Sequence, residues 1–200
     1  MEQVRTFIAV ELPDEIRDGL RRFQEELRGP IGGLVRWVNP EGIHLTLKFL
    51  GGVPMETLGA IQDALTRSAA GLSPFKLRLG KPGVFPNERS PRVVWVGVEG
   101  DLDRLGILQR RIEEKTGELG FKIEERPFTP HLTLGRVRET ASPLERRRLG
   151  ELVVNTPFES SAAFQVTYVS LMRSTLLPSG VVYDRIFLAD LISTLSTSSP

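Results

Sequence analysis

The sequence His44-Leu45-Thr46-Leu47 occurs a second time, 87 residues later, as His131-Leu132-Thr133-Leu134. These tetrapeptides contain the only two histidines of the chain. A match of all three residues after the second histidine would arise by chance about once in a thousand. We call residues 44–47 the first motif and residues 131–134 the second motif. Because a strand-then-helix order recurs at the same spacing, the repeat predicts two similar lobes of one fold.

Each motif lies in an apolar run typical of a β-strand, whose side chains alternate between two faces. The two leucines of the first motif share a face with Ile43 and Phe49, and we expect this face to point into the core. His44 and Thr46 share the other face, roughly 7 Å apart along the strand. The second motif predicts the same arrangement, with its leucines inward and its histidine and threonine outward.

The wider pattern predicts an α+β fold in which antiparallel sheets are backed by helices. Strands are expected at residues 4–11, 35–38, 43–50, 75–79, 93–98, 130–137, 163–172 and 181–188. Helices are expected from Asp14 to Gly29-Pro30, at 58–69, from Asp101 to Gly117, and at 143–152. A loop rich in proline and glycine is expected at 81–91. We expect residues 1–190 to form a single domain of two lobes, related by a pseudo-twofold axis around a central catalytic cleft. Residues 191–200 are expected to form a disordered tail.

The composition is that of an ordinary globular protein, with 200 residues of which 40% are hydrophobic and 26% are charged. The absence of cysteine excludes disulfides, thiolate metal sites and cysteine nucleophiles. A net charge of +1 argues against a protein that coats long nucleic acid. It does not argue against an enzyme that binds one strand end. The start of the chain lacks the long apolar core of a signal peptide, and no apolar stretch reaches the roughly 18 residues of a membrane helix. We therefore expect a cytoplasmic protein that does not enter a membrane.

Two histidines, each with a hydroxyl two residues later, suggest a general acid and a general base at one reacting centre. Histidine is the one side chain whose ordinary pKa lets it give or take a proton near neutral pH. In-line displacement at phosphorus needs one group of each kind, acting from opposite sides. The threonine hydroxyls can donate hydrogen bonds to the non-bridging oxygens, where charge builds up. From the residues alone, the acid and base roles are interchangeable.

Two other interpretations compete with this one. A single histidine on a strand is more often a half-buried core residue, and a threonine there usually reflects β propensity. The duplication of the whole motif weakens that interpretation. A zinc site normally takes three or four protein ligands. Since the chain has no further histidine and neither motif contains a carboxylate, we expect no metal and no cofactor.

At these motifs the chain resembles the 2H phosphoesterase superfamily, whose name refers to two His-x-Thr-x motifs. Within it, the chain is most similar to the RNA 2',3'-cyclic phosphodiesterases, also described as 2'-5' RNA ligases. The resemblance covers about residues 4–188. It is carried by residues 5–10, 35–51 and 127–136, and by residues 171–174 together with Tyr183.

The resemblance implies a bilobal α+β fold and hydrolysis of RNA 2',3'-cyclic phosphate ends to 2'-phosphomonoesters. It also implies ligation, the same transesterification run backward with a 5'-hydroxyl RNA in place of water. His44 then donates a proton and His131 accepts one, and Arg136 joins Thr46 and Thr133 as a phosphate-binding residue. Strict alternation would point Arg136 into the core, so we expect a bend or bulge at Gly135 to turn it outward.

Other residues near the motifs have weaker claims to a role. Lys48 lies on the His44 face of the expected strand and could reach a phosphate. Trp37 and Phe85 could stack on a base, although packing in the core is the commoner use of such a ring.

Three functional hypotheses follow from the sequence. The first is a metal-independent hydrolase of RNA 3' ends that bear a 2',3'-cyclic phosphate. The second is an RNA-end binding module without catalysis. The third is a cyclic phosphodiesterase of small cyclic nucleotides, such as an ADP-ribose cyclic phosphate. We expect a monomer, because a cleft between two lobes of one chain needs no partner.

Overall fold

The computed structural model of the chain describes residues 3–158, 162–178 and 180–192. Its strands are β1 (Gln3–Glu11), β2 (Val35–Trp37), β3 (His44–Pro54), β4 (Phe75–Phe85), β5 (Val93–Gly100), β6 (His131–Val137), β7 (Ala163–Val166), β8 (Tyr168–Leu177) and β9 (Gly180–Asp190). Its α-helices are α1 (Asp14–Ile31), α2 (Leu58–Ala69), α3 (Leu102–Gly117) and α4 (Pro143–Asn155). The predicted α+β fold is confirmed. Of the tail predicted to be disordered, residues 193–200 lie outside the described residues.

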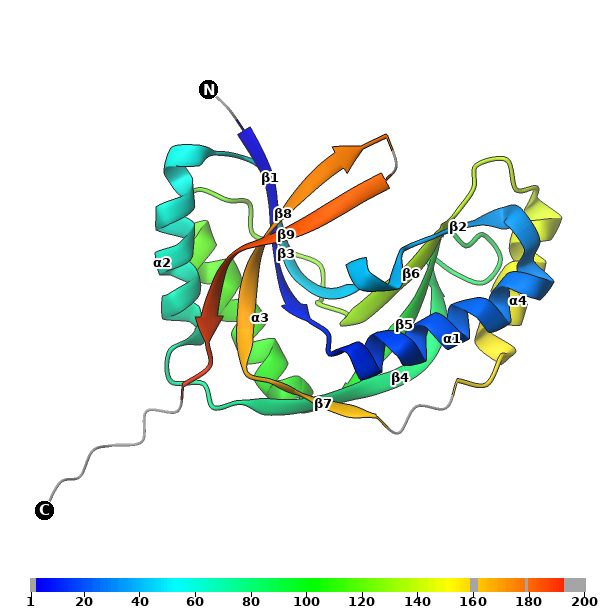
Figure 1. Cartoon of the computed structure of the whole chain (residues 1–200), viewed down its shortest axis with the longest axis horizontal. Helices are drawn as coiled ribbons and strands as arrows, with labels where there is room; N and C mark the ends of the chain where they lie inside the picture. Colours follow the sequence, from blue (N-terminus) through cyan, green and yellow to red (C-terminus); the bar gives the residue numbers. More distant parts are fainter. Residues whose placement is uncertain (1–2, 159–161, 179, 193–200) are drawn as a thin grey trace, which may run out of the picture.

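All of these strands join one antiparallel sheet, curled between two pairs of helices (Figure 1). The strand order is β7-β4-β5-β6-β3-β1-β8-β9, and β2 pairs with β6 outside this path. The two strands that begin with the motifs, β3 and β6, are therefore neighbours in the middle of the sheet. This position brings together two tetrapeptides that are far apart in the sequence.

The sheet divides into two halves that follow the predicted repeat. Strands β3, β1, β8 and β9 pack against α2 and α3, while β6, β5 and β4 lie on the side of α1 and α4 (Figure 1). Helix α1 follows β1 in the chain yet packs beside β6, where the Gln24 side chain donates hydrogen bonds of 2.9 Å to the carbonyls of Val38 and Leu134. Helix α3 follows β5 yet packs against β3. Each half therefore contains a helix from the other repeat, which binds the two lobes into one unit.

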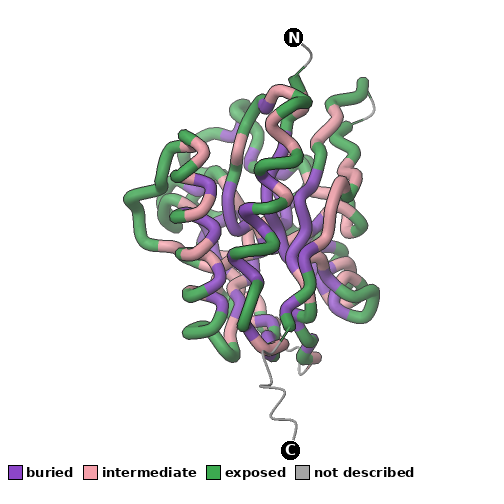
Figure 2. Tube along the Cα trace, turned by 90° about the vertical axis from the view of Figure 1, so that its left-hand side faces the viewer, coloured by how far each residue is buried: buried purple, intermediate pink, exposed green. Residues whose placement is uncertain are grey.

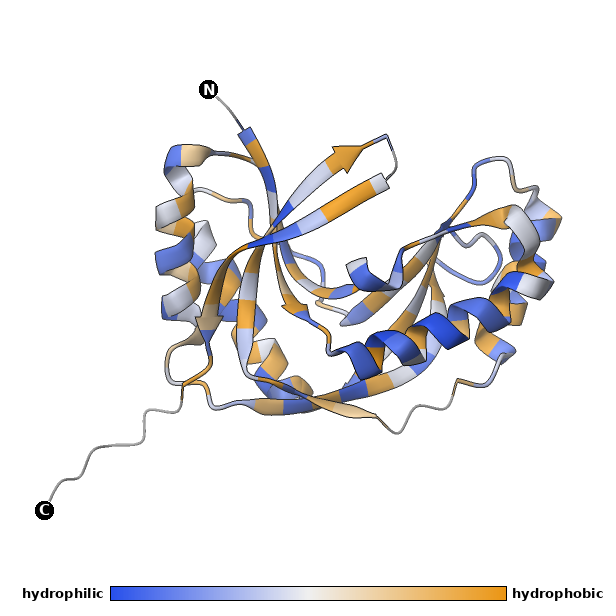
Figure 3. Cartoon of the chain, in the orientation of Figure 1, coloured by the Kyte–Doolittle hydropathy of each residue, from blue (hydrophilic) through white to orange (hydrophobic). Residues whose placement is uncertain are grey.

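The helices bury the apolar faces that the sequence predicts. These faces hold Ile16, Leu20, Phe23 and Leu27 on α1, Ile61, Leu65 and Ala69 on α2, and Leu105, Leu108 and Ile112 on α3. Buried residues lie where the helices and the sheet face each other (Figure 2). The helix surfaces that face away from the sheet are hydrophilic (Figure 3). Helix α4 begins with a capping box in which Ser142 and Glu145 satisfy each other's backbone amides. None of the described helices has both the length and the apolar character needed to cross a membrane.

Several predicted boundaries differ from the structure. The strand predicted at 163–172 is divided at Thr167 into β7 and β8, and β3 continues to Pro54. Helix α1 runs through Gly29-Pro30 and ends at Ile31, where Gly32 caps it with a φ of 61°. Strand β4 continues through much of the predicted loop 81–91, where Pro82 to Phe85 pair with β5. Beyond Arg78, β4 pairs with β5 alone among the described strands, and an edge position tolerates a proline.

Candidate active site

The two motifs meet where β3 and β6 pair, with Leu45 directly opposite Leu132. Both leucines are fully buried on the face of the sheet that the helices cover. Continued by one residue in each direction, this register sets the histidine of each motif opposite the threonine of the other. The two histidines, His44 and His131, therefore occupy diagonal positions of the antiparallel pair. Cα atoms at such positions are about 7–8 Å apart. All four polar side chains are half-buried and share the face away from the helices.

Both imidazole rings are anchored in the same way. Nδ1 of His44 lies 2.8 Å from the carbonyl oxygen of Gly42, and Nδ1 of His131 lies 2.8 Å from the carbonyl oxygen of Thr129. A carbonyl oxygen can only accept a hydrogen bond, so each Nδ1 carries the hydrogen and donates it. Nε2 of each ring is left to accept a proton when the ring is neutral, or to donate one when it is charged.

Aromatic side chains hold the His44 ring from two sides. Phe7 stacks on it with ring centroids 4.5 Å apart and an interplanar angle of 28°, and Tyr183 meets it edge-on at 5.0 Å. Burial among these rings lowers the pKa of His44, because it disfavours the charged imidazolium. The Gly42 carbonyl and the Glu11 carboxylate oppose this effect and raise the pKa in part. Without a ligand, the site therefore favours a neutral His44.

A second aromatic pair holds the His131 ring. Phe85 packs edge-on against it with centroids 4.9 Å apart, and Trp95 lies at 6.3 Å. The Trp95 ring lies across Gly83, where a Cβ atom would come within 2.4 Å of the indole. Phe85 thus supports a histidine in this structure, and Trp37 packs against the core from β2. The two motifs therefore have matching aromatic supports, although the rings differ.

A β-bulge follows the threonine of the second motif. Thr133 and Gly135 pair with successive residues of β5, so Leu134 is the extra residue of β6. The bulge reverses the alternation after it, and Arg136 is exposed on the same face as the motif histidines. The outward turn that the sequence predicts for Arg136 is confirmed.

The first motif is followed by the same irregularity, which the sequence analysis missed. Thr46 and Lys48 pair with successive residues of β1, so Leu47 is the extra residue of β3. Lys48 is consequently turned to the core side, where it is 5% exposed, and Phe49 is turned outward, where it is 72% exposed. The predictions that Phe49 belongs to the core and that Lys48 faces a phosphate are both wrong.

Arg36 is a further candidate that the sequence analysis did not single out. It lies directly opposite Arg136 in the pairing of β2 with β6, and both side chains are exposed. Like charges at directly opposed positions are destabilising. Neither guanidinium forms a salt bridge with any carboxylate in the part of the chain that the structure describes. Two unpaired arginines beside the motifs suit an anion. Only the β2–β6 register shows that they are neighbours.

The arrangement can carry out acid–base chemistry on an anionic group. Two imidazoles with available Nε2 atoms and two hydroxyls share one sheet face, and two guanidinium groups lie where β6 meets β2. Within residues 3–158, 162–178 and 180–192, no group of three or more histidine, cysteine, aspartate or glutamate residues is placed to hold a metal ion.

Sequence comparison matches the chain to a known family. The model of the family described as LigT-like phosphoesterases matches residues 10–95 and again residues 96–183, one match for each repeat. The RNA 2',3'-cyclic phosphodiesterase of Methanothermobacter thermautotrophicus is 38% identical over 181 residues, which are 90% of this chain and 95% of the relative. The protein of the same name from Archaeoglobus fulgidus is 38% identical over 182 residues, 90% of this chain and 96% of the relative.

Solved structures share the same architecture. TT0787 of Thermus thermophilus superposes with a TM-score of 0.76 at 31% identity, over 94% of this chain and 97% of that one. LigT of E. coli in complex with 3'-AMP superposes with a TM-score of 0.76 at 28% identity, over 95% of this chain and 99% of that one. The fold of this chain and that of these proteins therefore correspond over nearly their whole lengths.

Proposed function

The chain belongs to the LigT-like phosphoesterase family of the 2H superfamily, and on that premise we propose that it hydrolyses RNA 2',3'-cyclic phosphate ends to 2'-phosphomonoesters without a metal ion. The observation that carries the proposal is the meeting of both motifs on one sheet face, each with Nδ1 anchored and Nε2 available. The names of the curated relatives support the substrate class, and the 3'-AMP complex of E. coli LigT supports a nucleotide ligand. All site residues belong to one chain, so the proposal requires only a monomer whose catalytic domain is residues 1–190.

In this mechanism the phosphate lies between the two imidazoles. Thr46 and Thr133 donate hydrogen bonds to the non-bridging oxygens, and Arg136 stabilises their negative charge. Nε2 of His131 takes a proton from a water molecule as the water oxygen attacks phosphorus. The bond between phosphorus and O3' breaks, and Nε2 of His44 gives its proton to O3'. The product is a 2'-phosphomonoester with a free 3'-hydroxyl, and proton exchange with water restores both rings.

The proposal includes ligation, because each step is reversible. If a 5'-hydroxyl of a second RNA replaces water, its oxygen attacks phosphorus, the bond to O3' breaks and a 2'-5' phosphodiester forms. The reverse reaction cleaves the 2'-5' phosphodiester and forms the 2',3'-cyclic phosphate again. It uses the same two imidazoles, with their acid and base roles exchanged.

Turnover with and without a chelator tests the proposal. We expect the protein to convert an RNA oligomer with a 2',3'-cyclic phosphate end to the 2'-phosphomonoester at the same rate before and after EDTA treatment. Loss of turnover on chelation would contradict the metal-independent mechanism. Tight binding of the oligomer without turnover would favour a binding module. Faster turnover of an ADP-ribose cyclic phosphate than of the RNA end would assign the enzyme to small nucleotides.

The pH dependence of activity should follow the pKa of His44. One imidazole must be protonated and the other neutral, so kcat/KM is expected to fall at both ends of the pH range. On the acidic side, activity is lost when both rings hold a proton. Because burial lowers the pKa of His44 below 6.5, the acidic midpoint of kcat/KM should lie below pH 6.5. An acidic midpoint above pH 6.5 would contradict the lowered pKa of His44. A rate that changes in only one direction with pH would contradict a mechanism with one protonated and one neutral imidazole.

A further inference from the structure

A carboxylate stands beside the first motif histidine. Glu11 ends β1 and is the direct Cα partner of His44 in the β1–β3 register. Side chains at directly opposed positions of an antiparallel pair share a face, with Cβ atoms about 4.5–5.5 Å apart. The Glu11 side chain is 17% exposed, so its charge is screened less than that of a surface carboxylate. Its negative charge therefore acts on the His44 ring at short range.

Two side chains from neighbouring strands hold the Glu11 carboxylate in place. The Ser170 hydroxyl donates a hydrogen bond of 2.5 Å to Oε1, and Nε of Arg185 lies 3.3 Å from the same oxygen. Ser170 is fully buried on β8. Arg185 on β9 is 44% exposed, so solvent screens its guanidinium and the ion pair neutralises Glu11 only in part. The position of the negative charge is thus fixed by three strands.

In the second half of the sheet, a glycine takes the place that Glu11 has in the first. His131 pairs with Gly97 in the β5–β6 register. Strand β5 lies beside β6 as β1 lies beside β3, so Gly97 and Glu11 occupy equivalent places next to the two motif histidines. A Cβ atom at Gly97 would already come within 3.3 Å of the Lys81 carbonyl oxygen. The two histidines therefore differ in the charge beside them, although their motifs and their anchoring carbonyls match.

Several other titratable or charged groups face His44 from the elements around it. They are Tyr183 on β9, His131 and Arg136 on β6, Arg36 on β2, and Glu41 in the turn before β3, which is paired with Arg21 of α1. Cations repel an imidazolium, whereas a carboxylate attracts it. Burial has the largest effect on the pKa of His44 and lowers it, while the Gly42 carbonyl and the Glu11 carboxylate raise it. Glu11 thus offsets part of the cost of charging a ring that is packed among aromatic side chains.

We propose that Glu11 is a positioning residue that holds the shared proton of the catalytic pair on His44, and so makes His44 the acid and His131 the base. The inference rests on the proposed function and explains a division of roles that two equal motifs do not. The productive form has a charged His44 and a neutral His131. The form with the proton on His131 instead is unproductive in hydrolysis. A carboxylate beside one ring and a glycine beside the other favour the productive form.

The pH profiles of Glu11→Gln and Arg185→Gln test this inference. The glutamine keeps an oxygen that can accept from Ser170, but it removes the charge. The pKa of His44 is then expected to fall, so the acidic midpoint of kcat/KM should move to lower pH. Because the proton moves toward His131, the maximum of kcat/KM should fall about 3- to 30-fold. Arg185→Gln leaves Glu11 without its counter-charge, and should move the acidic midpoint to higher pH.

Glu151→Gln is the matched control. It neutralises a carboxylate of α4 that pairs with Nε of Arg147 at 2.9 Å, away from the motif face. It should change neither the acidic midpoint nor the maximum rate. NMR of the histidine side chains in the free protein measures the same effect without turnover. The titration midpoint of the His44 ring should be lower in Glu11→Gln than in the wild type, and higher in Arg185→Gln.

An unchanged NMR midpoint of His44 in Glu11→Gln would overturn the inference. Shifts of the same sign in Glu11→Gln and Arg185→Gln would also overturn it, since general loosening of the site gives such a result. A lowered NMR midpoint with an unchanged pH profile of kcat/KM would refute the role in catalysis. If Glu11→Gln does not fold, the direction of the shift in Arg185→Gln decides alone.

Failure of the wild-type protein to turn over an RNA 2',3'-cyclic phosphate end would instead overturn the proposed function. In that case, the NMR midpoints of the free protein still decide whether Glu11 controls the charge of His44.

Discussion

Replacing either His44 or His131 with alanine is expected to lower kcat/KM for a 2',3'-cyclic phosphate substrate by about 10²- to 10⁴-fold. Each ring supplies one of the two proton transfers, and Nε2 is the only ring nitrogen left for that purpose, because Nδ1 is bound to a backbone carbonyl. Since the two rings act in the same displacement, the double variant should be about as slow as either single variant.

Asparagine substitutions provide the matched control. The side-chain amide of His44→Asn or His131→Asn can still donate to the carbonyl that Nδ1 now contacts, while no group remains at the position of Nε2. These variants should unfold at the wild-type denaturant concentration and be as inactive as the alanine variants. Near-normal turnover in either asparagine variant would remove that histidine from the mechanism.

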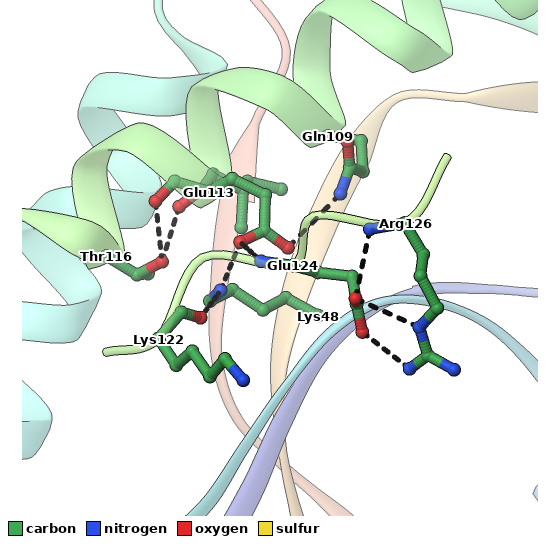
Figure 4. Close-up of polar contacts among 8 residues, drawn as sticks. Lys48, Gln109, Glu113, Thr116, Lys122, Glu124 and Arg126 are labelled. Atoms are coloured by element: carbon green, nitrogen blue, oxygen red, sulfur yellow. Dashed lines mark hydrogen bonds and ion pairs between the residues drawn. The ribbon is translucent and has the colours of Figure 1, made fainter. Parts of the chain in front are cut away.

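The second large effect concerns the buried ion pair between Lys48 and Glu113 (Figure 4). Lys48 also donates to the carbonyl of Lys122 at 2.8 Å. The carboxylate of Glu113 accepts from the Glu124 amide and from the Gln109 side chain, both at 3.2 Å. The pair therefore joins β3, which begins with the first motif, to α3 and to the segment that leads into the second motif.

Replacing Glu113 with alanine is expected to lower the free energy of unfolding by about 3–5 kcal/mol, because it leaves the ammonium of Lys48 buried without a counter-charge. Combining Lys48→Met with Glu113→Leu removes both charges, and should restore most of the lost stability. Chemical denaturation of the wild type, Lys48→Met, Glu113→Leu and the double variant that combines these two substitutions measures the coupling directly.

The exposed pair Arg147–Glu151 on α4 is the appropriate comparison. Its side chains are 67% and 51% exposed, and such pairs contribute about 1 kcal/mol or less. Glu151→Ala should therefore change the free energy of unfolding far less than Glu113→Ala does. Equal effects of the two substitutions would show that the Lys48–Glu113 pair is not a structural link between the motifs.

Much of the fold follows from periodicity along the sequence. The two motifs predict their own strands, and apolar residues at helical spacing predict the inner faces of α1, α2 and α3, all of which the structure confirms. The repeat also predicts a shared site, because two halves with the same order of elements place equivalent strands at equivalent positions. These features depend on local pattern, which the sequence displays directly.

The wrong predictions depend on geometry that local pattern does not contain. A bulge shifts alternation by one residue, so the side chains after Leu47 point opposite to the faces that a regular strand would give them. The position of Arg136 prompted the prediction of a bulge in β6, because strict alternation would have buried its charge. Strict alternation in β3 already places Lys48 outward and Phe49 inward, so the sequence gives no comparable signal for the bulge at Leu47. Arg36 becomes a candidate only through its strand partner, and pairing between distant segments is a property of the folded sheet.

The central claim is that both imidazoles act on one phosphate, and NMR of the histidine side chains tests it most directly. Because the chain has only two histidines, its long-range ¹H–¹⁵N spectrum contains two imidazoles, which His44→Asn and His131→Asn assign. Titration with adenosine 2'-phosphate is expected to shift Nε2 of both rings with one common dissociation constant and one ligand per chain. A shift in only one ring, or two different dissociation constants, would contradict the account.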